Sequence, residues 1–255
     1  MIENKKNKNI NNTANAIEYR HIKMDYDGKN IIPDFNLEIK KGEFVTVIGS
    51  SGCGKTTILK MANALISPTA GEILIDGKNI REYDLIALRR NIGYAIQGSV
   101  LFPHMSVEKN IAFVPSLLNK NDRERIGQAV RKWVKIVGLD EDILSRYPAQ
   151  LSGGQQQRVG IARALAASPD LLLMDEPFGA VDEITRANLQ DEILRIYHET
   201  GITILFVTHD INEALKLGTK ILVMDHGEIM QYANPDEIRV HPANDFVKIL
   251  LARAI

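Results

Sequence analysis

The sequence contains a single cysteine, Cys53, among its 255 residues. An internal disulfide is therefore excluded, and we expect a reducing compartment such as the cytoplasm. No run reaches the ~18 to 20 uninterrupted apolar residues of a membrane-spanning helix, and the N-terminus lacks the apolar segment of a signal peptide. The 31 Lys and Arg residues balance 32 Asp and Glu residues, so no global charge favours nucleic acid or anionic lipid. We expect a soluble protein with no nucleic-acid partner.

The chain divides into a short polar segment and one large domain. Residues 1–15 are rich in Asn and Lys and offer almost nothing to bury, which predicts a disordered tail. We expect residues 16–255 to form a single domain. Apolar and polar residues alternate at 17–24 and again at 35–39, which indicates antiparallel strands joined by the Asp27-Gly28 turn.

Continuous apolar runs farther along the chain are typical of strands covered on both faces. They lie at residues 44–48, which is apolar apart from Thr46, and at 171–174, 202–207 and 221–224. Helical patterns separate them, so we predict an α/β fold with a mainly parallel sheet and crossover helices. The region 89–149 shows helical periodicity and few strand signals, which indicates a helical insertion at about 98–150. Two short helices are expected between Pro235 and Ile255.

The segment Gly49-Ser-Ser-Gly-Cys-Gly-Lys-Thr56 matches the phosphate-loop pattern G-x-x-x-x-G-K-[ST], between the strand 44–48 and a helical run at 57–65. Backbone N–H groups of such a loop surround phosphate oxygens, Lys55 reaches the β- and γ-phosphates, and the Thr56 hydroxyl ligates Mg²⁺. The alternative is a glycine-rich turn that fits the pattern by chance. The candidate ATP contacts are Gly49, Ser50, Ser51, Gly52, Cys53, Gly54, Lys55, Thr56 and Thr57.

A second motif, Leu171-Leu-Leu-Met-Asp-Glu176, is an apolar strand that ends in two carboxylates. We expect Asp175 to hold Mg²⁺ through water and Glu176 to polarise the attacking water. Strands often end in an acidic residue at a loop. This pair therefore indicates a catalytic site only in combination with the phosphate loop upstream.

A third motif, Leu151-Ser-Gly-Gly-Gln155, precedes a predicted helix at 159–167. A serine and two glycines at a helix start form another anion-receptive terminus, although an ordinary N-cap would look the same. Two anion-binding helix starts in one chain suggest that two chains share one nucleotide.

These residues resemble a known family, because Leu151–Gln155 match the LSGGQ signature of ABC ATPases in full and the other motifs follow the family's order. The resemblance covers residues 17–251. It implies a P-loop NTPase core, an N-terminal antiparallel β subdomain and a helical subdomain. It also implies a head-to-tail homodimer in which ATP lies between the phosphate loop of one subunit and the signature of the other, here Ser152, Gly153, Gly154 and Gln155.

The family likeness assigns further roles. Gln97 resembles the glutamine that contacts Mg²⁺ and the attacking water, and Tyr26 resembles the aromatic residue that stacks on adenine. His209 resembles the histidine that contacts the γ-phosphate. Asp182 is a further candidate nucleotide-site residue, because Gly179-Ala-Val-Asp resembles the family's D-loop, where Ala-Leu-Asp is the commoner form. Taken singly, these residues also fit a loop glutamine, a half-buried strand tyrosine and a histidine near a strand end.

The segments 89–97 and 101–115 resemble the ATPases of bacterial importers for glycine betaine, carnitine and choline, with amino-acid and sulfonate importers as close neighbours. The implied partners are a transmembrane permease and, indirectly, a substrate-binding protein, and the implied location is the cytoplasmic face of the membrane. Phe102, Met105 and Phe113 are candidate permease contacts or core residues. Members of this group often carry a C-terminal regulatory domain, which we do not expect in a sequence that runs to Ile255. An exporter or a soluble assembly ATPase remains an alternative.

Overall fold

The computed structural model describes residues 14–26, 28–96, 101–118 and 122–252. Residues 1–13 of the expected tail lie outside this range, and Asn15, the last residue of that tail, is the first residue of strand β1. Within the described residues, no helix is both long and apolar enough to cross a membrane.

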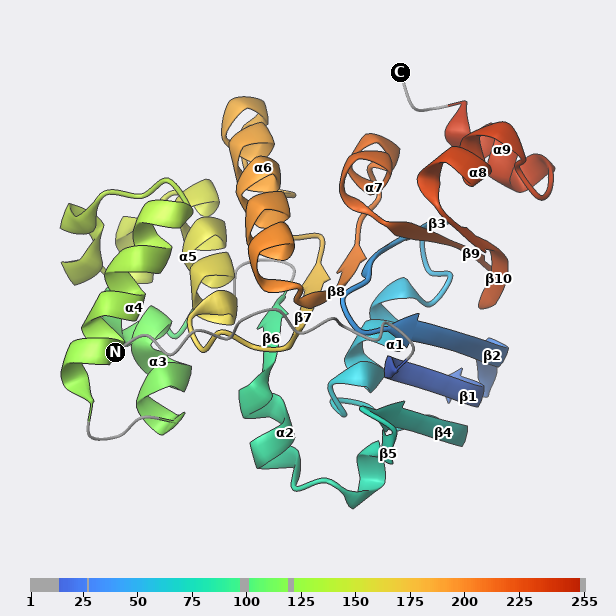
Figure 1. Ribbon diagram of the computed structural model, residues 1–255, viewed down its shortest axis with the longest axis horizontal. Coiled ribbons are helices and arrows are strands. Elements are labelled where there is room, and N and C mark those ends of the chain that lie inside the picture. Colours follow the sequence, from blue (N-terminus) through green and yellow to red (C-terminus); the bar gives the residue numbers. More distant parts are fainter. Residues whose placement is uncertain (1–13, 27, 97–100, 119–121, 253–255) are drawn as a thin grey trace.

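A six-stranded sheet in the order β10-β9-β3-β8-β7-β6 runs through the molecule (Figure 1). All neighbouring pairs are parallel except β9 with β10, as the apolar runs predicted. Its strands are β3 (Phe44–Gly49), β6 (Ile92–Ala95), β7 (Leu171–Asp175), β8 (Thr203–Val207), β9 (Lys220–Asp225) and β10 (Glu228–Ala233).

A second, antiparallel sheet has the order β2-β1-β4-β5. Its strands are β1 (Asn15–Tyr26), β2 (Lys29–Lys40), β4 (Ala70–Ile75) and β5 (Lys78–Asn79). The period-two pattern that predicted the first two strands reflects one buried face, with Ile17, Phe35 and Ile39 fully buried.

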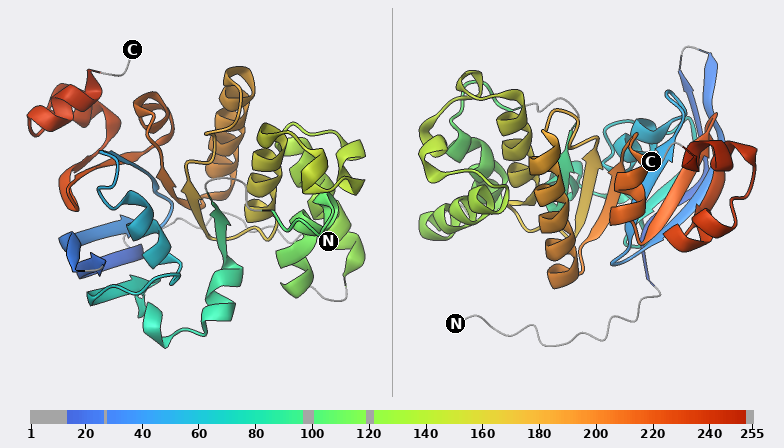
Figure 2. Two further views of the ribbon diagram at one scale, coloured as in Figure 1. Left: turned by 180° about the vertical axis from the view of Figure 1, so that it is seen from behind. Right: turned by 90° about the horizontal axis from the view of Figure 1, so that it is seen from above.

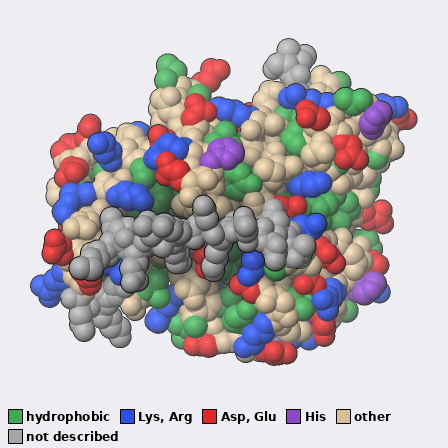
Figure 3. Space-filling model, viewed as in Figure 1, with side chains coloured by type: hydrophobic (Ala, Val, Ile, Leu, Met, Phe, Trp, Pro, Cys, Tyr) green, Lys and Arg blue, Asp and Glu red, His purple; other side chains and the backbone are tan. Residues whose placement is uncertain are grey.

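Helices flank both sheets. They are α1 (Lys55–Ala62), α2 (Leu85–Asn91), α3 (Val107–Leu118), α4 (Arg123–Ile136), α5 (Gly153–Leu165), α6 (Glu183–Thr200), α7 (Ile211–Leu217), α8 (Pro235–Val240) and α9 (Asp245–Leu251), with 3₁₀ turns η1 (Ile80–Glu82), η2 (Glu141–Ser145) and η3 (Pro148–Gln150). Figures 1 and 2 place α3 and α4 at one end of the molecule and α8 and α9 at the other. Figure 3 shows side chains of both charge signs interspersed over one face, in keeping with the balanced composition.

The core lies on both faces of the parallel sheet. Alternate residues of one strand point to opposite faces: Phe44 packs with helices α5 and α6, and Val45 packs with α1 and the antiparallel sheet. Burial on both sides explains why these strands are mostly apolar.

Two local predictions were wrong. Strand β6 lies inside the region 89–149, which showed few strand signals; it is only four residues long and contains Gly93, so its pattern is weak. A Cβ on Gly93 would lie 2.5 Å from the carbonyl oxygen of Ala164, so glycine there permits the close approach of α5. Helix α5 begins at Gly153 and not at residue 159, because Ser152 caps it and the signature residues form its first turn.

Candidate functional site

The candidate site lies where three parallel strands end. Val207 of β8 is paired with Val47 of β3 and with Asp175 of β7, so the loops that follow these strands meet at one edge of the sheet. In open α/β sheets, ligands bind outside the carboxyl ends of the strands.

The phosphate loop leaves β3 at Gly49 and enters α1 at Lys55. Gly49 has φ +151°, and a Cβ there would lie 1.9 Å from the carbonyl oxygen of Met224, so the backbone conformation requires glycine. Gly54 caps α1 in the left-handed conformation and offers no side chain to the first N–H groups of the helix. Those donors face the loop and suit an anion.

Lys55 is held against its own loop. Its Nζ donates to the carbonyl oxygens of Gly49 at 2.9 Å and Ser50 at 2.8 Å. The Ser50 hydroxyl donates to Asp225 Oδ1 at 2.5 Å, which ties the loop to the end of β9. Sequence reasoning missed Asp225, because no motif marks it and 175 residues separate it from Ser50.

The Cys53 thiol is buried within the loop, where its Sγ lies 3.9 Å from Lys55 Nζ. Its side chain is 3% exposed, and burial raises the pKa of the thiol. Its carbonyl oxygen accepts a hydrogen bond from the Gly227 N–H at 3.2 Å. Cys53 therefore stays a predicted nucleotide contact through its backbone.

Thr56 and Asp175 meet as the two motifs require. The Thr56 hydroxyl donates to Asp175 Oδ1 at 3.0 Å. Asp175 is 2% exposed; burial raises the pKa of its carboxyl, and the hydrogen bond from Thr56 opposes that rise.

The oxygens of Thr56 and Asp175 are hard donors that suit Mg²⁺, which binds through one or two carboxylates together with substrate phosphates and water. The described residues contain no group of three or more His, Cys, Asp or Glu side chains that could hold a metal by themselves. The donor set therefore fits a Mg²⁺ ion that a nucleotide helps to bind.

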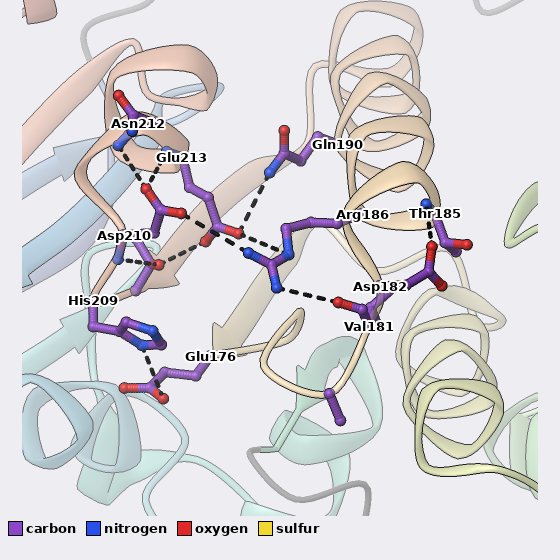
Figure 4. Close-up of polar contacts among 12 residues, drawn as sticks. Glu176, Val181, Asp182, Thr185, Arg186, Gln190, His209, Asp210, Asn212 and Glu213 are labelled. Atoms are coloured by element: carbon purple, nitrogen blue, oxygen red, sulfur yellow. Dashed lines mark hydrogen bonds and ion pairs between the residues drawn. The ribbon is translucent and has the colours of Figure 1, made fainter. Parts of the chain in front are cut away.

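Glu176 and His209 face each other across the ends of β7 and β8 (Figure 4). Glu176 Oε2 lies 3.3 Å from His209 Nδ1, with side-chain exposures of 24% and 71%. Glu176 has φ +45°, a left-handed conformation that costs about 1 kcal/mol in a residue with a side chain. Its N–H donates to the carbonyl oxygen of Val207 at 2.9 Å, which fixes this backbone against the neighbouring strand.

Gln157 of α5, which sequence reasoning missed, holds the turn after Glu176. Its amide nitrogen donates to the Glu176 carbonyl oxygen at 3.3 Å, and its oxygen accepts from the Ala180 N–H at 2.8 Å. Gln157 is 5% exposed. It directly follows the signature and its neighbour Gln156, so the pattern gave no reason to single it out.

The signature residues form a capped helix start. The Gln155 N–H donates to Ser152 Oγ at 3.2 Å, and the Ser152 N–H donates to Gln155 Oε1 at 2.9 Å, a reciprocal capping box. A Cβ on Gly154 would lie 3.2 Å from the Ala180 carbonyl oxygen, so glycine allows α5 to approach the turn before α6. Within the described ranges, no hydrogen bond joins residues 152–155 to the phosphate loop.

Tyr26, Asp182 and Gln97 were also predicted to belong to the site. Tyr26 ends β1 and is 44% exposed, so its ring is open to a planar ligand. Asp182 caps α6 by accepting the Thr185 N–H at 3.0 Å, and this bond lowers the pKa of its carboxyl. Gln97 lies outside the described residues.

Phe102, Met105 and Phe113 are half-buried. The rings of Phe102 and Phe113 pack with centroids 4.8 Å apart. These side chains are therefore packed on one side and exposed on the other, which combines features of core residues and of contact residues. Asn110, fully buried, accepts from the Phe102 N–H and donates to the carbonyl oxygens of Phe102, Met105 and Ser106. The loop with Phe102 and Met105 thus has a fixed shape.

A glycine-bent loop leading into a helix, with a buried aspartate beside its threonine, defines a P-loop nucleotide-binding fold. The family model described as ABC transporter matches residues 32–179. The chain belongs to the ABC transporter family.

Relatives and solved structures agree with this assignment. The chain is 50% identical over 238 residues to the carnitine transport ATP-binding protein OpuCA of Listeria monocytogenes, covering 93% of this chain and 60% of that relative. It is 49% identical over 238 residues to the glycine betaine uptake system ATP-binding protein YehX of Escherichia coli, covering 93% of this chain and 77% of that protein. The fold matches the ATP-binding cassette MJ0796, solved as a dimer bound to ADP and Pi, with a TM-score of 0.81 and 33% identity over 86% of this chain and 98% of that one.

Proposed function

We propose that this chain is the ATP-hydrolysing subunit of an ABC importer for a small quaternary amine such as glycine betaine, carnitine or choline. The observation that carries the ATPase part is the meeting of the phosphate loop, Asp175, Glu176 and His209 at one sheet edge. Its chemistry is phosphoryl transfer to water, which needs positioning and charge stabilisation more than covalent catalysis.

The proposed roles are those that the motifs and the family resemblance imply. The N–H groups of residues 49–57 and the Lys55 ammonium hold the phosphates, and Tyr26 stacks on adenine. Thr56 and Asp175 hold Mg²⁺, with Gln97 as a third contact; the ion neutralises charge on the phosphates when bound. Glu176 orients and polarises the attacking water, and His209 contacts the γ-phosphate.

The active unit in this proposal is a head-to-tail dimer. In one chain the helix start at residues 152–155 makes no hydrogen bond with its own phosphate loop in the described part of the structure. In the dimer, residues 152–155 of a second copy supply hydrogen-bond donors to the nucleotide held by this phosphate loop. Asp182 lies beside those residues at the subunit boundary. The dimeric state of the similar cassette supports this arrangement.

The first test measures ATP turnover of the wild-type chain and of Glu176→Gln. The glutamine keeps the size of the side chain and removes its basicity, so we expect a loss of turnover of about 10²- to 10⁴-fold. ATP binding should persist, and a dimer should accumulate with ATP in size-exclusion chromatography. Glu228→Gln, an exposed position on β10, is the matched control and should retain turnover. Wild-type turnover in Glu176→Gln would remove the assigned role.

The transported solute is proposed from the relatives named for carnitine and glycine betaine. The chain spans 60% of the length of the Listeria relative, so its partners form part of the proposal. They are a transmembrane permease, contacted through Phe102, Met105 and Phe113 at the cytoplasmic membrane face, and an extracellular or periplasmic substrate-binding protein that acts through it.

The second test reconstitutes the chain with co-expressed permease candidates and a substrate-binding protein. Stimulation of ATPase activity by glycine betaine, carnitine or choline is the expected result. Stimulation by amino acids or sulfonates alone would reassign the solute, and co-purification with a soluble scaffold instead of a permease would refute the importer.

A further inference from the structure

A buried polar cluster lies behind the candidate site, between α6 and α7 (Figure 4). Its centre is Glu213, which is 6% exposed. Glu213 Oε2 accepts the Thr208 hydroxyl at 2.6 Å, and Oε1 accepts the Gln190 amide at 3.4 Å. Sequence reasoning singled out none of these residues, and the proposed function uses none of them.

Arg186, on the first turns of α6, reaches into this cluster from the other side. Its Nη2 donates to the Val181 carbonyl oxygen at 3.1 Å. Its Nη1 lies 4.0 Å from Asp210 Oδ2, and its Nε lies 4.0 Å from Glu213 Oε1. One guanidinium thus contacts the turn before Asp182 and both carboxylates that follow β8.

The cluster holds His209 on both sides. Thr208, directly before it, is bonded to Glu213, and Asp210, directly after it, contacts Arg186 and caps α7 through the N–H groups of Asn212 and Glu213. The His209 side chain is 71% exposed. Its direction therefore depends on the backbone of residues 208–210, which the cluster fixes.

The contacts of Arg186 differ from those of a stabilising buried salt bridge. Such a bridge needs close, hydrogen-bonded geometry to offset the cost of removing two charges from water. Both ion contacts here span 4.0 Å, which is longer than a hydrogen-bonded ion pair, and the buried Nε has no hydrogen-bond partner in the described part of the chain. The one hydrogen bond of the guanidinium goes to a main-chain carbonyl oxygen of the turn at residues 179–182.

We propose that Arg186 is a positioning residue that, through Glu213 and Asp210, couples the turn at residues 179–182 to the loop that carries His209. The inference rests on the proposed ATPase function. The turn at 179–182 lies beside the signature residues, since a Cβ on Gly154 would be 3.2 Å from the Ala180 carbonyl oxygen. In the proposed dimer the signature faces the second copy, so this link reports the arrangement at that subunit boundary to the histidine of the same chain. Arg186 acts through these loops and touches no phosphate.

The test compares ATP turnover and thermal unfolding of the full chain with Arg186→Gln, Arg186→Lys, Glu213→Gln and the double variant Arg186→Gln/Glu213→Gln. Arg195→Gln is the matched control, because Arg195 lies exposed on the same helix and, among the described residues, pairs only with Glu192 and Glu199. We expect Arg186→Gln to lower kcat about tenfold, which corresponds to about 1.4 kcal/mol. The KM for ATP should stay within about twofold, since the phosphate loop is untouched.

The double variant separates positioning from stability. Arg186→Gln leaves a buried carboxylate without its cation and should lower the melting temperature; Glu213→Gln in the same chain removes that charge and should restore it. The kcat should stay low, because no side chain then links Val181 to residues 208–210. Arg186→Lys, which keeps the charge without the planar fork, should recover part of the kcat.

Each outcome decides between a coupling role and a purely structural role of Arg186. Recovery of kcat together with melting temperature in the double variant would show a purely structural role and overturn the coupling, as would a kcat of Arg186→Gln equal to that of Arg195→Gln. If Arg186→Gln does not fold, the double variant and Arg186→Lys give the same decision. Absence of turnover in the wild-type chain would instead overturn the proposed ATPase function and the coupling with it.

Discussion

Replacement of Asn110 should destabilise the protein by an amount that follows from its hydrogen bonds. The side chain is fully buried and makes four contacts with the segment from Phe102 to Ser106, at 2.8 to 3.2 Å. Its oxygen accepts one bond, but its NH₂ group has only two hydrogens for three carbonyl oxygens, so about three full hydrogen bonds exist at once. At about 1 kcal/mol net for each bond, Asn110→Ala should cost about 3 kcal/mol of unfolding free energy.

The assay is equilibrium unfolding in urea together with thermal melting. A loss of about 3 kcal/mol in a chain of this size lowers the melting temperature by roughly 6 to 12 °C. Asn91→Ala is the matched control: Asn91 is exposed and donates one bond, at 3.1 Å, to the Ala87 carbonyl oxygen, so its loss should stay below about 0.5 kcal/mol. If Asn110→Ala also costs less than 0.5 kcal/mol, the claim that this residue fixes the loop is wrong.

Three other predictions concern the loop and the buried cluster. Gly49→Ala should abolish ATP binding, measured by nucleotide titration, because its Cβ would meet the Met224 carbonyl oxygen at 1.9 Å; Gly28→Ala, also at positive φ but with no atom within 4 Å, should bind ATP normally. Native Cys53 should react with N-ethylmaleimide far more slowly than the unfolded chain, since burial both shields the thiol and raises its pKa; equal rates by mass spectrometry would contradict this placement. Burial also raises the pKa of Glu213 above its ordinary 4.5, so the folded state binds this proton more tightly than the unfolded state and stability from this group falls as pH rises. The melting temperature of the wild type, measured relative to that of Glu213→Gln, should therefore rise as the pH is lowered from 7 to 5. An unchanged difference would show that this carboxyl does not titrate as described.

The sequence predicted those parts of the fold that depend on local patterns. Continuous apolar runs predicted β3, β7, β8 and β9, because a strand covered on both faces has no polar side. Strand β6 escaped because four residues with a central glycine give too little pattern. The serine and two glycines at 152–154 were expected at a helix start, and the capping box of Ser152 and Gln155 forms one; only the residue at which the helical run begins, 153 and not 159, differed.

The candidate site was predictable where contact with a ligand dictates both residue type and spacing. Lys55, Thr56 and Asp175 belong to such patterns, and the structure brings the last two to 3.0 Å. The burial of the Cys53 thiol was not predictable, because the loop pattern leaves this position open and only the packing decides which way the side chain points.

Three of the residues that escaped prediction share a physical feature: their side chains bind main-chain groups and not a ligand. Gln157 holds the backbone at Glu176 and Ala180, Arg186 holds the backbone at Val181, and Asn110 holds the backbone at Phe102. A side chain that bonds to a carbonyl or N–H group places no demand on the type of its partner residue, so no pair of letters in the sequence records the contact. Of these, Gln157 supports the backbone of Glu176 and Arg186 contacts Asp210 beside His209, and the precision of a phosphoryl-transfer site depends on that backbone. Substitutions at the supporting positions should therefore change turnover while every motif stays intact, which is the result that the Arg186 variants test.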